Sequence, residues 1–594
     1  MLIGPVFSRE VTTTPRSWRL YASRAVYVAA LFALVLTAWL ILIGSQQVRG
    51  LGDLARFGSA VFGLLAPLQL AMAIAFSALL TAAAVAQEKD RRTLDLLLMT
   101  NLSNAELVLG KLLASMLSVL VLIVAASALL MLITLLGGVS YGQVLRVLAV
   151  TFTAAAVAGS LGSTIALWRE KTFQSLAMTA LVLVLWLLGG EILASGVQHA
   201  SWLGISTEQW AIATTPFRAI LAAIRPLEAT DSLFGVYGGP VVLFLLVSSA
   251  FAVLLNLWAI VRVRTWNPIQ EQRQSVTEAD TEEHSTTTKT AARGKREVKS
   301  REVWDNPILW REIMTWAYGK KIVVIRLAYL VVFAICAVAL ISYLGDDDRN
   351  MSRTAIQLAA AKPVVPLVVI GLVLVNALAV TSLTNERDLR ALDLLLVTDL
   401  TPKEIVLGKL GGIFYNSKEM VLLPLVMCVV LWYTEHLTTE NLAFLVLSLL
   451  VMNVFVAMLG VHSGMTYLES RTAVAVSLST VLFLLLGIAV CMRMMMAFQS
   501  SFTYQFQAFT AFMLGGGAGL FMALGSRNPS SAIGLMSMVT PFATFYVLTS
   551  YLQGNFGFAF LVTAVTYGFA TAAMLIPAID EFDVATGRTT GNNE

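Results

Sequence analysis

Long apolar runs alternate with short polar segments along almost the whole chain. Most runs are about 20 residues or longer, the length that a helix needs to cross the hydrocarbon of a bilayer. Six runs precede a polar stretch and six follow it, which predicts two groups of six membrane-spanning helices. The predicted spans are 25–44, 59–86, 106–137, 144–168, 173–194 and 239–261, then 323–343, 364–384, 404–433, 441–467, 473–492 and 556–577.

The polar stretch at 265–303 is rich in Glu, Thr, Lys, Arg and Gln and carries almost no large apolar side chains. Such a composition is typical of a solvated linker. We therefore expect a first transmembrane domain at 1–264, a cytosolic linker, and a second transmembrane domain at 304–594. One further apolar piece, at 509–525, is short and interrupted by glycines, which favours a re-entrant or interfacial segment over a full crossing.

Composition supports the membrane class. Hydrophobic residues make up 58% of the 594 positions and charged residues 13%, whereas soluble domains have about half and about a quarter. The net charge of +4 is spread over loops and linker, so no surface for nucleic acid is indicated. Cys336, Cys428 and Cys491 fall within or beside apolar runs, which indicates neither a disulfide framework nor a zinc site. The predicted fold class is an all-α polytopic membrane protein.

The distribution of Lys and Arg predicts the orientation. Most of them fall on one side of the membrane if both termini are cytoplasmic, as expected for a multi-pass protein of the cell (inner) membrane. An even number of spans in each half gives both halves the same orientation. The two halves are therefore expected to be parallel repeats of about 12 transmembrane helices in all.

The strongest internal signal is a 25-residue block that occurs once in each half. EKDRRTLDLLLMTNLSNAELVLGKL at 88–112 and ERDLRALDLLLVTDLTPKEIVLGKL at 386–410 align without a gap and are identical at most positions. A repeat of this length indicates that one membrane unit has been duplicated. It is also the segment least like lipid-facing filler.

The start of the block has a charged face and an apolar face. If 88–99 is one helix, Glu88, Arg92 and Asp95 follow at i, i+4 and i+7 and form a single stripe. The second copy repeats this stripe as Glu386, Arg390 and Asp393. An amphipathic helix on the cytosolic membrane surface fits the pattern, with leucines toward the bundle. Its charges either meet a partner and brace the helix, or only anchor a loop at the headgroups.

The end of the block predicts a helix start. Ser103-x-x-Glu106 and Thr401-Pro402-x-Glu404 have the spacing of a capping box, in which two side chains satisfy backbone donors of the first turn. Lys111 and Lys409 lie about two turns further on in the two copies.

A second repeated element precedes the first span of each half. GPVFSREV at 4–11 matches NPILWREI at 306–313, so that Arg9 and Glu10 correspond to Arg311 and Glu312. Asn-Pro is a helix start signal, and the pattern indicates an interfacial connecting helix. A simple interface anchor explains it equally well.

These elements resemble the permease of type 2 ABC transporters. The resemblance rests on NPILWRE at 306–312, on the E-x-x-x-R-x-L-D-L-L-L run at 88–98 and 386–396, and on the E-x-V-L-G-K run at 106–111 and 404–409. It implies a permease, and more often an exporter, that is driven by two separately encoded ABC ATPase subunits. The coupling residues that it implies are Glu88, Arg92, Asp95, Glu106, Lys111, Glu386, Arg390, Asp393, Glu404 and Lys409, and the connecting-helix residues are Arg9, Glu10, Arg311 and Glu312.

The chain itself has no signature of an enzyme. Gly110-Lys111 lacks the upstream glycine and the following Ser or Thr of a phosphate loop. We expect no cofactor or metal in this chain, and ATP is expected in the partner subunits.

The transport path is expected between the halves, along the second and fifth spans, by analogy with the family. Gln69, Asn376 and Ser477 are polar candidates on these spans. Two other classes stay open: a secondary transporter of six plus six spans, and a non-transporting membrane anchor of an ATPase complex. Scarce charges within the spans argue against ion coupling and favour an amphipathic, lipidic or polymeric cargo. The sequence does not identify the substrate.

Overall fold

A computed structural model describes most of the chain as helix. The described residues are 7–8, 12, 18–45, 50–90, 92–169, 172–196, 201–202, 205–225, 239–267, 304–314, 322–345, 353–389, 391–497, 502–525, 530–580 and 582. Within them the only sheet is a two-residue antiparallel pairing of β1 (Ser201–Trp202) with β2 (Ile205–Ser206). The predicted all-α class is confirmed.

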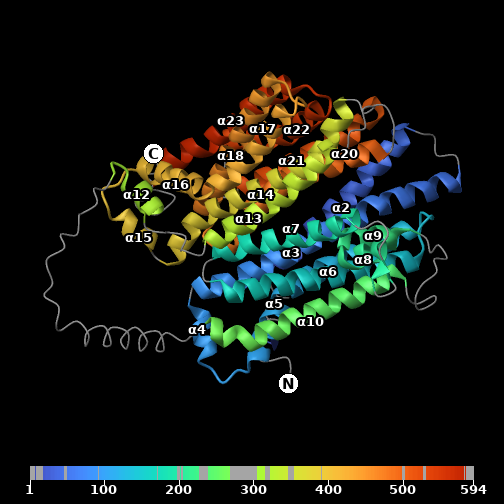
Figure 1. Cartoon of the computed structure of the whole chain (residues 1–594), viewed down its shortest axis with the longest axis horizontal. Helices are drawn as coiled ribbons and strands as arrows, with labels where there is room; N and C mark the ends of the chain where they lie inside the picture. The colour runs from blue at the N-terminus through green and yellow to red at the C-terminus, as the bar shows by residue number, and fades with distance from the viewer. Residues whose placement is uncertain are drawn as a thin grey trace.

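Two helical bundles lie side by side (Figure 1). The first contains α2 (Trp18–Ser45), α3 (Leu51–Asp90), α4 (Thr93–Leu98), α5 (Asn104–Thr134), α6 (Tyr141–Trp168), α7 (Thr172–Gly196), α8 (Thr207–Thr214), α9 (Pro216–Ile224) and α10 (Pro240–Trp266). The second contains α12 (Pro307–Met314), α13 (Ile322–Gly345), α14 (Arg353–Asp388), α15 (Ala391–Leu396), α16 (Pro402–Asn416), α17 (Lys418–Tyr433), α18 (Thr439–Thr466), α19 (Ser470–Leu482), the π-helix η3 (Phe483–Gly487), α20 (Ile488–Ala497), α21 (Phe502–Leu524), α22 (Ser531–Leu552) and α23 (Phe556–Asp580).

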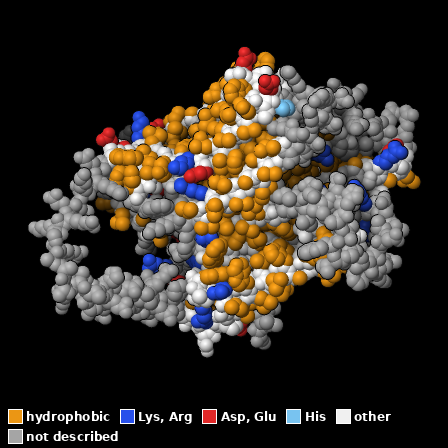
Figure 2. All heavy atoms as spheres, viewed as in Figure 1, with side chains coloured by type: hydrophobic (Ala, Val, Ile, Leu, Met, Phe, Trp, Pro, Cys, Tyr) orange, Lys and Arg blue, Asp and Glu red, His pale blue; other side chains and the backbone are white. Residues whose placement is uncertain are grey.

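The helices have the length and composition of membrane spans. In the described part of the chain, 11 helices are long and apolar enough to cross a bilayer. A twelfth span is counted if the bent pair α16 and α17 forms one crossing. The described apolar parts of α2 and α7 are shorter. Apolar side chains cover much of the described surface in Figure 2, as expected for helices that face lipid. The chain is a multi-pass membrane protein.

The second and fourth spans form the closest helix pair in each half, α3 with α6 and α14 with α18. Small residues allow this approach, because a Cβ atom at Gly162 would lie 2.4 Å from the carbonyl oxygen of Ala78, and one at Gly460 2.6 Å from the Cβ of Ala379. Close packing over small residues is the usual way in which membrane helices associate. The duplicated unit therefore keeps its central contact in both halves.

The two ends of the molecule differ in what they carry. One end holds α4, α12 and α15, and the other holds α8 and α9 (Figure 1). We refer to them as the α4/α15 end and the α8/α9 end. The halves meet along a seam in which α7 packs on α13 and α14, α3 packs on α19 and α20, and α2 packs on α21.

The segment expected to be re-entrant belongs to a longer helix that runs the depth of the bundle. Near the start of α21, Gln505 donates to the carbonyl of Met495, 3.2 Å away at the far end of α20. At the other end of α21, Tyr467 donates to the carbonyl of Ala523. Tyr467 follows α18 and is itself held by Arg387 at the end of α14. The structure thus differs from the short piece expected at 509–525.

The following helix, α22, returns along α21 and was not expected from the sequence as a span. Both helices are less apolar than their neighbours, with a mean hydropathy of 1.4 for Gln505–Leu524 and 1.5 for Ser531–Leu552, against 2.6 for Thr472–Met496. Hydroxyl side chains and Pro541 inside α22 weaken the apolar signal. Because the pair adds two passes, it leaves the relative orientation of the halves unchanged. The domain boundaries at 264 and 304 stay a prediction.

Candidate coupling site

The repeated block begins with a break between two helices. α3 and α4 are separated at Arg92, whose φ of 57° lies in the left-handed region. Such a residue turns the chain out of the α-helical path. Glu88 therefore lies in the last turn of one helix and Asp95 on the next, so the predicted single stripe of Glu88, Arg92 and Asp95 is wrong.

The second copy breaks at the same place. α14 ends at Asp388, two residues before Arg390, and α15 starts one residue after it. Arg390 itself lies outside the described residues, as does the side chain of Asp393. The predicted stripe of Glu386, Arg390 and Asp393 is therefore also interrupted by the end of a helix.

α4 has one buried apolar face and one exposed apolar face. Leu94 and Leu98 are buried against the bundle, as the sequence predicted. Leu96 is 65% exposed and Met99 is 59% exposed, although both are apolar. Arg92 is exposed beside them.

α15 presents the equivalent surface. Leu392 is buried, whereas Leu394 is 74% exposed and Val397 is 86% exposed. In the alignment of the repeats Leu394 corresponds to Leu96 and Val397 to Met99. Each copy therefore exposes a pair of apolar side chains, which we call the apolar pair, at the same two positions.

Both predicted capping boxes are confirmed. The Glu106 amide donates to Ser103 Oγ at 3.3 Å, and the Ser103 amide donates to the Glu106 carboxylate at 3.0 Å. Thr401 and Glu404 make the same two bonds, at 3.3 and 2.8 Å. Each box fixes the first turn of the third span, which begins a short turn after α4 or α15 ends.

The two repeated lysines point away from solvent and pair with carboxylates. Lys111 forms an ion pair with Glu88. Lys409 lies 2.6 Å from Glu312 and 2.7 Å from Glu386, and its side chain is 2% exposed.

Arg311 completes the second cluster by pairing with both Glu312 and Glu386. We call Arg311, Glu312, Glu386 and Lys409 the ion network. Two cations and two carboxylates balance in charge, which is the arrangement that burial of ions requires. The network joins α12, α14 and α16.

Neighbouring charges favour the ionised forms of Glu312 and Arg311. Burial raises the pKa of the Glu312 carboxyl, but Lys409 and Arg311 outweigh this effect and leave the pKa below its ordinary value. Burial likewise lowers the pKa of Arg311, and Glu386 and Glu312 reverse the shift so that the pKa is raised. Each charge therefore stabilises its neighbours.

The structure sorts the residues predicted from sequence into two groups. Glu88, Lys111 and the ion network join helices through ion pairs, whereas Arg92 is exposed and Asp95 is half-buried. Arg9 and Glu10, the expected partners of the first copy, lie outside the described residues. The exposed apolar pairs were not predicted as contact residues, although the repeat places them in register.

Sequence reasoning also missed two charges in each copy. Lys89 and Arg387 donate to backbone carbonyls at the ends of α6 and α18, and Asp90 and Asp388 accept from hydroxyls at the starts of α7 and α19. Their signal was present in the aligned triplets EKD and ERD, which keep a charge of the same sign at each position.

A further arginine, Arg264, contacts the repeated block of the first half; the described contacts include no equivalent in the second half. Arg264, in the last turn of α10, donates to Asn104 Oδ1 at 2.7 Å and to the carbonyl of Leu102 at 3.1 Å. It therefore ties the sixth span to the turn between α4 and α5.

The predicted path residues are packed inside the protein. Ser477 donates to Asn376 Oδ1 at 2.9 Å, and the Asn376 amide donates to the carbonyl of Val456 at 2.9 Å. Gln69 is 1% exposed. In this state the three side chains line no open path, and their place on one stays a prediction.

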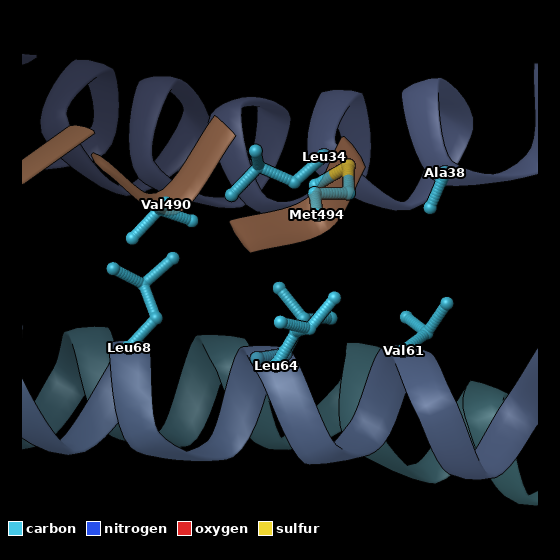
Figure 3. A pocket seen from close by; sticks show the side chains of 8 residues that line it. Leu34, Ala38, Val61, Leu64, Leu68, Val490 and Met494 are labelled. Atoms are coloured by element: carbon cyan, nitrogen blue, oxygen red, sulfur yellow. The ribbon is translucent and has the colours of Figure 1, made fainter. Parts of the chain in front are cut away.

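A small apolar gap lies on the seam, toward the α8/α9 end. Figure 3 shows side chains from α2, α3 and α20 pointing toward one another across it. The lining residues are Leu34, Ala38, Val61, Leu64, Leu65, Leu68, Val490 and Met494. The second span of one half and the fifth of the other thus meet here through apolar groups.

Comparison with known families agrees with the geometry. Residues 5–263 match the model of the ABC-2 family transporter protein. This region belongs to the ABC-2 transporter family. None of the curated proteins that were compared matches the chain. The matched region carries α4 and the first apolar pair, and the second half repeats this block in sequence and in structure.

The match supports a coarse role for the chain as a membrane permease component of an ABC transporter. The family implies association with ABC ATPase subunits. Both α4 and α15 lie at the same end of the two bundles (Figure 1).

Proposed function

We propose that the chain is the permease of an ATP-driven exporter, and that α4 and α15 each dock one separately encoded ABC ATPase subunit. The observation that carries the proposal is the repeated apolar pair, Leu96 with Met99 and Leu394 with Val397. Exposed apolar side chains at equivalent positions of two rigid turns are typical of a contact surface with a central apolar anchor.

The way in which α4 and α15 are mounted supports a role in coupling. Their buried leucines fix them to the bundle, and the capping boxes fix the first turns of α5 and α16, which begin a short turn after them. A displacement of α4 or α15 therefore moves the start of the third span with it. Ion pairs from Lys111 and Lys409 join that span to the end of the second.

Two copies of one ATPase fit this surface better than two different subunits. The apolar pairs, the capping boxes and the internal lysines recur at matching positions, so the two docking surfaces resemble each other in shape. Docking of ATPases also implies that the α4/α15 end faces the cytoplasm, in keeping with the cytoplasmic termini expected from the sequence. The scarcity of charge within the spans favours an amphipathic or lipidic cargo.

Substitution of the apolar pairs tests the proposal. The double variant Leu96→Glu/Leu394→Glu should insert normally but should lose the ABC ATPase on co-purification, because it places charges in an apolar contact. Leu51→Glu is the matched control, since Leu51 is 86% exposed at the α8/α9 end. Full ATPase retention in the double variant would refute the docking surface.

The same preparation separates the other two functions. A secondary transporter would move cargo without any ATPase, and would do so equally well after the double substitution. A non-transporting anchor would bind the ATPase through the apolar pairs, but ATP would drive no movement of any cargo in sealed vesicles.

A further inference from the structure

The last two charged residues of α3 and α14 hold a neighbouring helix junction in each half. Lys89 Nζ donates to the carbonyls of Leu167 and Arg169, the latter at 2.8 Å, where α6 ends. Carbonyls in the last turn of a helix have no donor within the helix, so a cation supplies what they lack.

The second half has the same contact with a different cation. Arg387 donates to the carbonyls of Met465, at 3.3 Å, and Tyr467, where α18 ends. Lysine in one copy and arginine in the other therefore perform the same task. What matters at this position is a positive donor within reach of the helix end.

The neighbouring aspartates hold the next helix. Asp90 accepts a hydrogen bond from Thr172, the first residue of α7. Asp388 accepts one from Ser470, the first residue of α19, at 2.7 Å. A carboxylate beside the start of a helix is also favoured by the helix dipole.

Each second span thus grips both sides of the short connection between the fourth and fifth spans. These are the same spans that form the seam, since α7 packs on α13 and α14 and α3 packs on α19 and α20. Ala177 on α7 and Ala473 on α19 follow these contacts by about one turn and are 0% exposed.

We propose that the pairs Lys89–Asp90 and Arg387–Asp388 are latches, each of which holds the second and fifth spans of its own half together at the α4/α15 end. They are positioning residues and touch no cargo. The proposal rests on the transport path assumed above, but the geometry of the latch does not depend on an ATPase. Separation of the second and fifth spans of a half at this end then requires that its latch release.

Thiol accessibility tests the latch without ATPase or cargo. The background is the detergent-solubilised permease with its three buried cysteines, Cys336, Cys428 and Cys491, replaced by alanine. Ala473→Cys reports on the second latch and Ala177→Cys on the first. A membrane-impermeant maleimide is the probe, and unfolded protein gives the rate for full access.

The chain supplies its own matched controls. Arg387→Gln should increase the labelling rate of Ala473→Cys by about tenfold or more, because hydrogen bonds from a charged donor are lost. Arg387→Lys, which copies the first half, should keep labelling slow. Lys89→Gln and Lys89→Arg should behave in the same way with Ala177→Cys.

A second reporter distinguishes a latch from general loosening. Ala508, on α21 near the α8/α9 end, is 2% exposed. A cysteine placed there should stay unlabelled when Arg387→Gln is introduced. Labelling at both ends, or equal slow labelling in Arg387→Gln and Arg387→Lys, would overturn the proposal. If Arg387→Gln fails to fold, Ser470→Ala removes the opposite contact with little change of volume and must speed labelling at Ala473→Cys.

The outcome is independent of the docking test. If Arg387→Gln does not speed labelling but ATPase binding still depends on the apolar pairs, only the latch is refuted. If Arg387→Gln speeds labelling but ATPase binding does not depend on the apolar pairs, only the docking surface is refuted.

Discussion

The third span is one continuous helix in the first half and two helices in the second, although both begin with the same capped sequence. α5 continues for 31 residues. α16 ends after 15 residues, and α17 leaves it at 57°. The repeat is therefore kept at the α4/α15 end and lost further along the same helix, which indicates that the shared function lies at that end.

Two polar contacts lie at or just after the bend in the second half. Pro424 has no amide N–H, so the carbonyl of Met420 lacks its helical donor, and the hydroxyl of Tyr329 bonds to it at 3.3 Å. The Asn416 amide donates to the carbonyls of Gly412 and Glu312, at 2.9 and 3.4 Å, and so ties the break to α12.

Glycines on α16 bring α12 close enough to build the ion network. A Cβ atom at Gly412 would lie 2.6 Å from the Cβ of Glu312, and one at Gly408 would lie 2.7 Å from Asn306 Oδ1. The position of Gly411 corresponds to Leu113 in the first copy. The two halves therefore keep the same docking turn but brace it with different internal contacts.

Substitution of the paired lysine in each copy should give the largest difference in stability loss between the two halves. Lys409→Met leaves two carboxylates beside one arginine in a buried site and should destabilise the fold by about 3–5 kcal/mol. Lys111→Met should cost less, about 1 kcal/mol, because the side chain of Glu88 is 40% exposed and water can solvate it. Thermal unfolding in detergent measures both, and equal losses would show that the two clusters are equivalent.

Acid should weaken the second cluster through Glu312. Its folded pKa lies below the ordinary value of 4.5, so its charge contributes stability above that value and the contribution is lost as the pH falls through the lowered folded pKa. The difference in unfolding temperature between the native chain and Glu312→Gln should therefore shrink below about pH 4.5. A difference that stays constant at lower pH would contradict an ionised Glu312.

The hydrogen bond from Tyr329 to the Met420 carbonyl can be tested by a double-mutant cycle. Tyr329→Phe should cost about 1 kcal/mol, because the Met420 carbonyl loses its donor. In a Pro424→Leu background the helix supplies that donor itself, so the same substitution should cost little. Additive effects in unfolding measurements would mean that the hydroxyl does not compensate for the proline.

The smallest expected difference lies at the capping boxes. Ser103→Ala and Thr401→Ala should each cost about 1 kcal/mol, because each removes one acceptor for a backbone amide of the first turn. Unfolding should show nearly the same loss in both halves. A loss confined to one half would mean that the two docking turns are not built alike.

Much of this architecture could be predicted from the sequence, and the failures have physical causes. Apolar runs and the block repeat sufficed for the membrane class, the capping boxes and the buried leucines of α4. The single stripe through Arg92 failed because helical spacing says nothing about one left-handed residue. α22 was missed because its Ser, Thr and Pro residues lower the apolar signal of a helix that packs against protein.

Tertiary partners were the least accessible part. The pairing of Lys409 with Glu312 and Glu386 was not predicted, because the two carboxylates come from two other helices. The charges of the EKD and ERD triplets also bond to helix ends about 80 residues away. Aligned charges indicated that these residues matter, but only the fold shows what each one holds.

Site-specific photo-crosslinking tests docking at both copies most directly. A benzophenone amino acid is placed at Leu96 or at Leu394, and the permease is irradiated in native membranes with its ABC ATPase present. If each turn docks one subunit, both positions should yield a covalent adduct with the ATPase, whereas the same probe at Leu51 should not. Adducts only with lipid from Leu96 and Leu394 would show that α4 and α15 are membrane anchors, and would contradict the docking surface.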